Sequence, residues 1–340
     1  MVESGAPVGE FRNPTARIAL FRTLAILLAV TVSTINWVVF RLPSSGLTSA
    51  MAPLLLTCGV LSSPSPELRR RNFFLYIFAV AAIQFGRGWL SYHDGLSLAF
   101  VALATFLVHR FISNSAGAAS VMAAGLQDVG QIGFAENANA VISLILAGLI
   151  IAWLYSLLEK FFPIPRDRPI MPQAPPFDNA AIFRRTLMFT IAYYFVELTG
   201  WQESFWITLS VGIACSGGET GERLHHVAFL RGLLAPAGFV FAIFWMESSA
   251  WMNYQFNYLL FAIGFAAFYI LHRYGNYAVF YILFLLMITA ADTLTAGQFK
   301  FGNPYNYLFQ GMACVGIGNA IILLVEPRTR EKSELAANPA

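Results

Sequence analysis

The chain has 340 residues, of which 57% are hydrophobic and only 11% are charged, and its formal net charge is +3. A soluble domain carries about 25% charged residues, so this composition excludes a chain whose whole surface faces water. The sequence therefore predicts an integral membrane protein of the all-α class.

Apolar runs long enough to cross a hydrocarbon core of about 30 Å as a helix recur along the chain. Six helices are expected first, over 18–40, 47–61, 72–90, 95–108, 116–134 and 138–158. Six more are expected over 185–200, 204–215, 227–246, 254–271, 277–291 and 305–325. The first run lacks a small-residue cleavage site close behind it, so we expect a retained helix and not a signal peptide.

The segment between the two sets, from Phe162 to Phe177, contains six prolines and three charged residues, which is typical of an extended polar connector. The expected organisation is an N-terminal six-helix repeat (1–161), a cytoplasmic linker (162–183), a C-terminal six-helix repeat (184–327) and a cytoplasmic tail (328–340).

Landmarks recur between the two halves at a nearly constant offset. His109-Arg110 returns as His272-Arg273 after 163 positions, and Asp128 returns as Asp292 after 164. Such self-similarity is typical of an internal duplication. An even number of helices returns the chain to its starting side, so the halves are predicted to be parallel repeats in a bundle of twelve transmembrane helices.

The basic residues predict the orientation. With the N-terminus in the cytoplasm, all but three of the 21 Lys and Arg residues fall on the cytoplasmic side, the exceptions being Arg41, Arg87 and Lys300. Both termini and the linker are then cytoplasmic. The triple Arg69–Arg71 is expected in the connection before the third helix. A cytoplasmic loop is expected to contain Glu219, Glu222 and Arg223.

Asp128 and Asp292 are the first candidates for proton coupling. A carboxylate inside a membrane helix costs about 2.5–3.5 kcal/mol on insertion scales, so such residues usually face a cavity or a partner. Burial makes a carboxyl able to exchange a proton near neutral pH. The alternative is that both lie in water at the outer ends of their helices. Glu197, near the end of the seventh helix, is a third candidate.

One arginine and two His-Arg pairs are further candidates for function. Arg87, between Gly86 and Gly88, is a substrate-anion candidate, and the alternative is that it snorkels to the outer interface. The pairs His109-Arg110 and His272-Arg273 are candidates for a cytoplasmic gate. Their alternative reading is an ordinary positive-inside signal with favourable cations at helix C-termini.

The sequence contains no spacing typical of a metal site or a catalytic set. Cys58, Cys215 and Cys314 lie singly in apolar runs, and His225-His226 has no partner histidine or cysteine at ligand spacing. No metal, no cofactor and no enzymatic activity are therefore predicted.

The glycines and small residues between Ala116 and Gly133 suit close helix packing or a broken helix that lines a cavity.

Residues 201–238 resemble the fusaric acid resistance and aromatic acid exporter superfamily. The resemblance rests on a tryptophan-led helix from Trp201, a short turn over 217–223, and Arg231-Gly232 at the arginine-glycine position before small residues. The first half departs from the pattern, because Arg69–Arg71 replaces the motif. The chain is similar to compact members, with a short linker where larger exporters carry soluble domains.

The resemblance implies proton-driven efflux of aromatic carboxylates or related toxic compounds across a bacterial inner membrane, with a periplasmic membrane-fusion adaptor as partner. Arg231, at the arginine-glycine position, is a second substrate-anion candidate beside Arg87. The expected partners are thus a small organic anion, the adaptor and the bilayer, with no nucleic acid, and a homo-oligomer is left open. The rival hypotheses are a passive organic-anion channel of the same fold and a non-transporting membrane assembly subunit.

Overall fold

The structure is a computed structural model that describes part of the chain. The described ranges are 56–57, 59–61, 63–90, 93–112, 115–126, 134–163, 178–201, 204–215, 220–233 and 304–327, with single positions 18, 21, 24, 25, 28, 29 and 32 of an N-terminal helix. Within these ranges all regular secondary structure is helical and no strand occurs. The all-α prediction is confirmed for this part of the chain.

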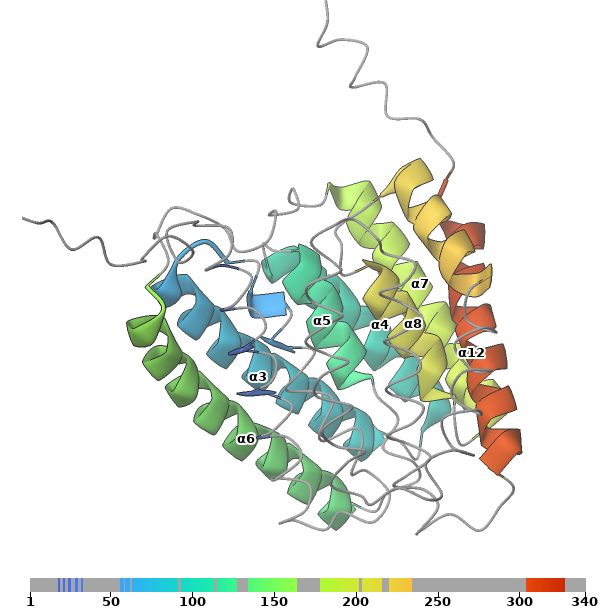
Figure 1. The fold of residues 1–340 in the computed structure, drawn as a ribbon. Coiled ribbons are helices and arrows are strands. Elements are labelled where there is room, and N and C mark those ends of the chain that lie inside the picture. The colour runs from blue at the N-terminus through green and yellow to red at the C-terminus, as the bar shows by residue number, and fades with distance from the viewer. Residues whose placement is uncertain are drawn as a thin grey trace, which may run out of the picture.

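The labelled helices keep the chain order of Figure 1. They are α3 (Pro66–Leu90), α4 (Asp94–Phe111), α5 (Ser115–Gly125), α6 (Phe134–Phe161), α7 (Asn179–Thr199), α8 (Phe205–Cys215) and α12 (Pro304–Val325). A further helix covers 221–233. The helices expected over 254–271 and 277–291 lie outside the described residues.

Several helices begin earlier than the apolar pattern predicts, because polar caps extend them beyond the apolar run. At α3, Ser65 accepts a hydrogen bond from the backbone N–H of Leu68 (3.2 Å), and Pro66 occupies the first helical position. The expected position of Arg69–Arg71 in a connection was therefore wrong, because all three lie inside α3.

The start of α7 has the same cause. Asp178 accepts from the backbone N–H of Ala181 at 2.6 Å, so α7 begins at Asn179, within the residues expected to form the linker. Gly200 ends the helix in the left-handed conformation with φ 57°. The helix over 221–233 also begins early, and the expected loop position of Glu222 and Arg223 was wrong.

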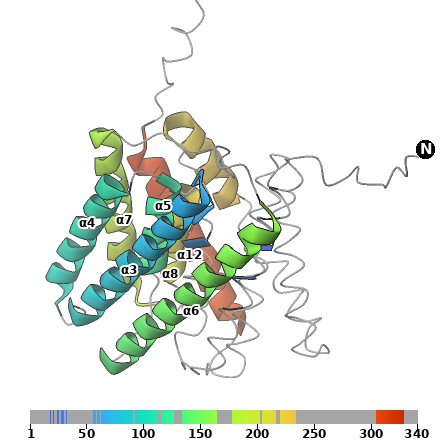
Figure 2. The same cartoon turned by 90° about the vertical axis from the view of Figure 1, so that its left-hand side faces the viewer.

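Two short helices form the centre of the bundle. Every residue of α8 is buried, and so is every residue of α5 except Ala116. In Figures 1 and 2, α5 and α8 lie between the pair α3 and α6 on one side and the pair α7 and α12 on the other. At 1.5 Å per residue, an 11-residue helix is about 16 Å long, which is half of a hydrocarbon core.

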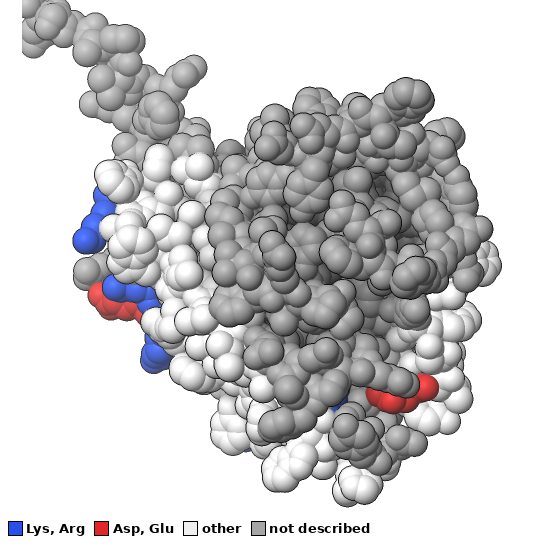
Figure 3. Space-filling view, turned by 90° about the horizontal axis from the view of Figure 1, so that it is seen from below, with Lys and Arg blue, Asp and Glu red and all other residues white. Residues whose placement is uncertain are grey.

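The outward faces of the surrounding helices are apolar. Large exposed side chains include Phe78 of α3 at 59%, Leu103 of α4 at 56% and Trp153 of α6 at 62% exposure. In Figure 3 the described surface seen from below is mostly uncharged, with its few charged side chains in small groups near the edges. Large apolar side chains exposed on the outward faces are typical of a surface that contacts a membrane or another apolar partner.

Two of the described helices are long and apolar enough to cross a membrane, namely Pro66–Leu90 and the Val141–Phe161 part of α6. Length and composition alone support this statement. The twelve-helix count and the two-repeat organisation remain predictions.

Glycines allow the central helices to approach closely. A Cβ on Gly212 of α8 would lie 2.4 Å from the Cβ of Ala123 in α5, and a Cβ on Gly318 of α12 would lie 2.7 Å from the carbonyl oxygen of Ile207. Such contacts are typical of helix packing inside membranes.

Replacing Gly212 with Val should separate α5 from α8. Overpacking of a filled core costs about 1–3 kcal/mol, so the variant should unfold several degrees lower than the wild type in detergent micelles. The matched control is Gly316→Ala in α12, where an added Cβ would meet no described atom within 4 Å. That control should unfold at the same temperature or slightly higher, since alanine favours helix. Equal unfolding temperatures for both variants would contradict the close α5–α8 contact.

Candidate functional site

The C-terminal end of α5 is buried inside the bundle, and neighbouring helices supply hydrogen-bond donors to it. The side-chain amide of Gln84 donates to the carbonyl of Ala124 at 3.2 Å, and the guanidinium of Arg87 donates to the carbonyl of Leu126 at 3.3 Å. The hydroxyl of Thr208, on α8, has the carbonyl of Phe205 at 3.0 Å and the same Leu126 carbonyl at 3.3 Å as acceptors. The carbonyls at the end of α5 would otherwise lack partners, because a helix leaves its last four unpaired.

This end of the helix concentrates polar chemistry in an apolar bundle. Gln84 and Arg87 are only 4% and 8% exposed, respectively. The partial negative charge of a helix C-terminus is complementary to a guanidinium. The side chain of Arg87 therefore points inward to the end of α5. It does not extend outward, as the alternative of snorkelling to the outer interface would require.

A second polar contact lies between α4 and α7. The hydroxyls of Ser97 and Tyr193 are 2.8 Å apart, and both residues are 2% exposed. The charges of Arg87 and Glu197 both act on the Tyr193 hydroxyl. The structure thus brings together an anion candidate and a proton-coupling candidate from two different helices, although Glu197 itself is exposed. Nothing in the sequence links Tyr193 or Ser97 to them.

The remaining acidic candidates are not described. Asp128 lies within 127–133 and Asp292, His272 and Arg273 lie within 234–303, outside the described residues. In sequence, Asp128 follows Leu126 by two residues and so comes directly after the polar end of α5.

At the opposite end of α4, the His109-Arg110 pair is split. His109 is 4% exposed, its Nδ1 lies 2.9 Å from the Thr105 carbonyl, and its ring packs against Phe189 with centroids 5.9 Å apart. Arg110 is exposed. The two residues predicted to act together as a gate therefore face different surroundings, one inside the bundle and one outside.

Arg185 of α7 joins His109 at this end and was not among the residues singled out from the sequence. It is 1% exposed, its Nη1 contacts the Sγ of Cys215, and its charge also acts on His109. The charge of Arg231, which is 9% exposed, also acts on Cys215. The sequence did contain a pattern that points to Arg185, because it matches Arg22 at the repeat offset of 163. The positive-inside rule already accounted for a basic residue at this position, so it was not selected as a candidate.

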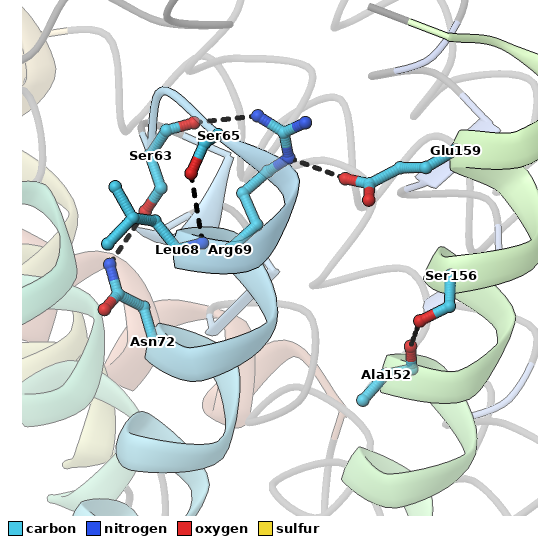
Figure 4. A network of polar contacts seen from close by, with 8 residues as sticks. All are labelled: Ser63, Ser65, Leu68, Arg69, Asn72, Ala152, Ser156 and Glu159. Carbon is cyan, nitrogen blue, oxygen red and sulfur yellow. Dashed lines mark hydrogen bonds and ion pairs between the residues drawn. The ribbon is translucent and has the colours of Figure 1, made fainter. Parts of the chain in front are cut away.

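Two carboxylates tie pairs of helices together. Glu159 in the last turn of α6 accepts from the Nε of Arg69 in α3 at 2.8 Å, and the Nη1 of Arg69 donates to the Ser63 carbonyl at 2.9 Å, as Figure 4 shows. The Arg69 and Glu159 side chains are 4% and 13% exposed, respectively. The guanidinium also lies over the ring of Phe21, 5.7 Å from its centroid.

The second carboxylate is Glu326, directly after α12. Its Oε1 accepts from the backbone N–H of Gly221 at 2.7 Å, and its Oε2 lies 3.3 Å from the Nε of Arg184. Its backbone carbonyl contacts the Nε2 of His225. Glu326 therefore joins α12 to α7 and to the start of the helix over 221–233.

Among the described residues no group of three His, Cys, Asp or Glu side chains could hold a metal ion. The described cysteines, Cys215 and Cys314, are buried and form no disulfide. Comparisons of the chain with protein-family models, with curated proteins and with solved structures found no match.

Replacing Glu159 with Gln should leave the buried charge of Arg69 without its counter-charge. Removal of one partner from a buried ion pair is strongly destabilising, and we expect a loss of about 2–4 kcal/mol in the free energy of unfolding. The neighbouring substitution Lys160→Gln is the control, because Lys160 is exposed and should change stability by less than about 0.5 kcal/mol. Chemical unfolding in detergent measures both. A Glu159→Gln variant as stable as Lys160→Gln would show that the pair contributes nothing.

Proposed function

We propose that the protein is a membrane transporter of small organic anions and not an enzyme. The observation that carries the proposal is the buried end of α5, where an 11-residue helix stops inside the bundle and a buried arginine, a glutamine and a threonine from other helices gather round its carbonyls. Membrane carriers bind their substrates and ions at helix ends that lie inside the bundle, because unpaired backbone groups are tolerated there only where protein or a cavity surrounds them.

The charge of the substrate follows from Arg87. Its guanidinium carries a fixed positive charge, and its Nη1 donates to the carbonyl of Leu126. A planar guanidinium recognises carboxylates through two parallel hydrogen bonds, which an apolar surrounding strengthens. At the other end of the bundle, Arg185 and Arg231 supply further buried positive charge, so an anion meets a cation at each end of its path. Aromatic carboxylates are the substrates that the resemblance of residues 201–238 favours.

Proton coupling is the proposed source of energy. Asp128 follows the polar end of α5 in sequence, and the charge of Glu197 acts on Tyr193 close to Arg87. A deprotonated carboxylate near a substrate-binding arginine competes with the substrate anion for that positive charge, so binding of the anion favours protonation of the carboxyl and couples the two events. Asp292 occupies the corresponding place in the second half of the sequence.

The setting of this activity is also proposed. The twelve-helix bundle, its place in a bacterial inner membrane with both termini in the cytoplasm, and the periplasmic membrane-fusion adaptor rest on the hydropathy pattern, the distribution of Lys and Arg, and the family resemblance. The apolar outer faces of α3, α4 and α6 support the membrane setting.

Arg87→Gln tests the role of the arginine. In proteoliposomes, uptake of a panel of aromatic acids, including salicylate and 4-hydroxybenzoate, should fall at least about tenfold, because a charge-assisted hydrogen bond is lost. Arg71→Gln is the matched control on the same helix, since Arg71 is exposed. Its uptake should equal that of the wild type. Equal loss in both variants would point to a general effect of charge, and uptake unchanged in Arg87→Gln would refute the assignment.

The double variant Asp128→Asn with Asp292→Asn tests the coupling. In inside-out vesicles with an imposed pH gradient, the wild type should accumulate the acid above its equilibrium level, and the double variant should only equilibrate it, because an amide carries no exchangeable acidic proton. Wild-type flux that is indifferent to the gradient and to both substitutions would favour the passive channel. No wild-type flux of any acid would contradict transport by the isolated chain and favour the assembly subunit.

A further inference from the structure

A second polar position lies along the same side of α5, well inside the bundle. Tyr76 of α3 is 1% exposed, and its hydroxyl finds no hydrogen-bond partner among the described residues. A buried hydroxyl without a partner costs free energy, and native structures almost always satisfy such groups with protein, water or a ligand.

The hydroxyl points directly at the backbone of α5. A Cβ on Gly117 would lie 2.0 Å from this oxygen, so only glycine leaves room for the phenol. Gly117 also faces the short helical segment that contains Gly59, because a Cβ on Gly59 would lie 3.1 Å from the Cα of Gly117 and 3.0 Å from the Oγ of Ser120. Three helices therefore meet at two glycines, with the Tyr76 and Ser120 hydroxyls at their junction.

This junction and the site at Arg87 belong to one seam. Along α3, Tyr76 meets Gly117 near the start of α5, and Ile83, Gln84 and Arg87 meet the stretch from Ala124 to Leu126 at its end. The two helices therefore run parallel. Nine residues of helix separate Gly117 from Leu126, which is about 13 Å. A single-ring carboxylate cannot contact both ends of this distance at once.

We propose that the Tyr76 hydroxyl, at the junction of Gly59, Gly117 and Ser120, is a second binding station for the oxygen atoms of the transported carboxylate. This proposal rests on the proposed transport function and adds a position on the route to it. The substrate moves along the α3–α5 seam between the station at Tyr76 and the station at Arg87.

The packing of the seam allows such passage. In the described conformation the Tyr76 hydroxyl is sealed from solvent, so a ligand reaches it only when the helices separate. The contact at Gly117 is a ring packed against bare backbone, and the Tyr76 hydroxyl has no hydrogen bond among the described residues to break when the helices separate. Alternating access in carriers consists of such relative movements of helices.

The test compares two buried tyrosines. Tyr155 of α6 is 6% exposed, and its hydroxyl donates to the Ala25 carbonyl at 3.1 Å, so Tyr155→Phe removes a protein hydrogen bond. Tyr76→Phe removes none among the described residues. Salicylate binding to the detergent-purified full chain is measured by calorimetry, and thermal unfolding is measured without ligand. The variant Arg87→Gln identifies which binding phase belongs to the position at Arg87.

The expected result is a wild type that binds salicylate in two phases. Tyr76→Phe should weaken one phase at least about tenfold, leave the phase that Arg87→Gln removes, and unfold at the wild-type temperature or higher. Tyr155→Phe should unfold at a lower temperature and keep both phases.

Two outcomes overturn the proposal. If Tyr76→Phe binds as the wild type does, the hydroxyl does not contact the carboxylate and only the position at Arg87 remains. A lower unfolding temperature of that variant would then show that the hydroxyl holds a structural water. If the wild type neither binds nor transports salicylate or the other acids of the panel, the proposed function falls and this station falls with it.

Discussion

The need to satisfy backbone carbonyls away from water governs this bundle. A helix that stops inside an apolar environment exposes its last carbonyls, and each unsatisfied group there costs several kcal/mol. At the end of α5 the cost is offset by Gln84, Arg87 and Thr208, which come from α3 and α8. These donors fix the distance and register of the three helices. They also place an arginine where an apolar side chain would otherwise be expected, so the interactions that stabilise the fold also give the bundle its polar interior.

Composition and periodicity were enough to predict the helical class and the approximate positions of α3, α4, α6, α7, α8 and α12. The centres of α3, α4, α7, α8 and α12 agree with the apolar runs. The ends differ, because hydropathy does not detect caps: Ser65 and Asp178 start their helices several residues before the apolar run. The early end of α5 at Gly125 was missed, although its small residues had indicated either close packing or a broken helix.

The site was predicted less completely than the fold. Arg87 and Glu197 stood out because they are charged residues in apolar helices, and the structure places both near Tyr193. Tyr193, Ser97, Gln84 and Tyr76 could not be found in this way, since uncharged polar residues are common in membrane helices and their meaning depends on which helices are neighbours. Arg185 and Arg69 were assigned to the cytoplasmic surface by their charge. Both are buried, because each has a partner on another helix: Arg69 pairs with the carboxylate of Glu159, and Arg185 contacts the thiol of Cys215. Pairing between residues so far apart in sequence has no local signature.

The two carboxylates that tie helices together respond differently to change in the sequence. Glu159 holds the side chain of Arg69, so that contact requires a particular residue at each end. Glu326 holds the backbone amide of Gly221, whose φ of 60° restricts the position to glycine for reasons of conformation. Among related sequences, the first contact would appear as two positions that vary together. The second would appear as an acidic position and a glycine that do not vary together. A survey of covariation would therefore detect the contact of Glu159 and overlook the contact of Glu326.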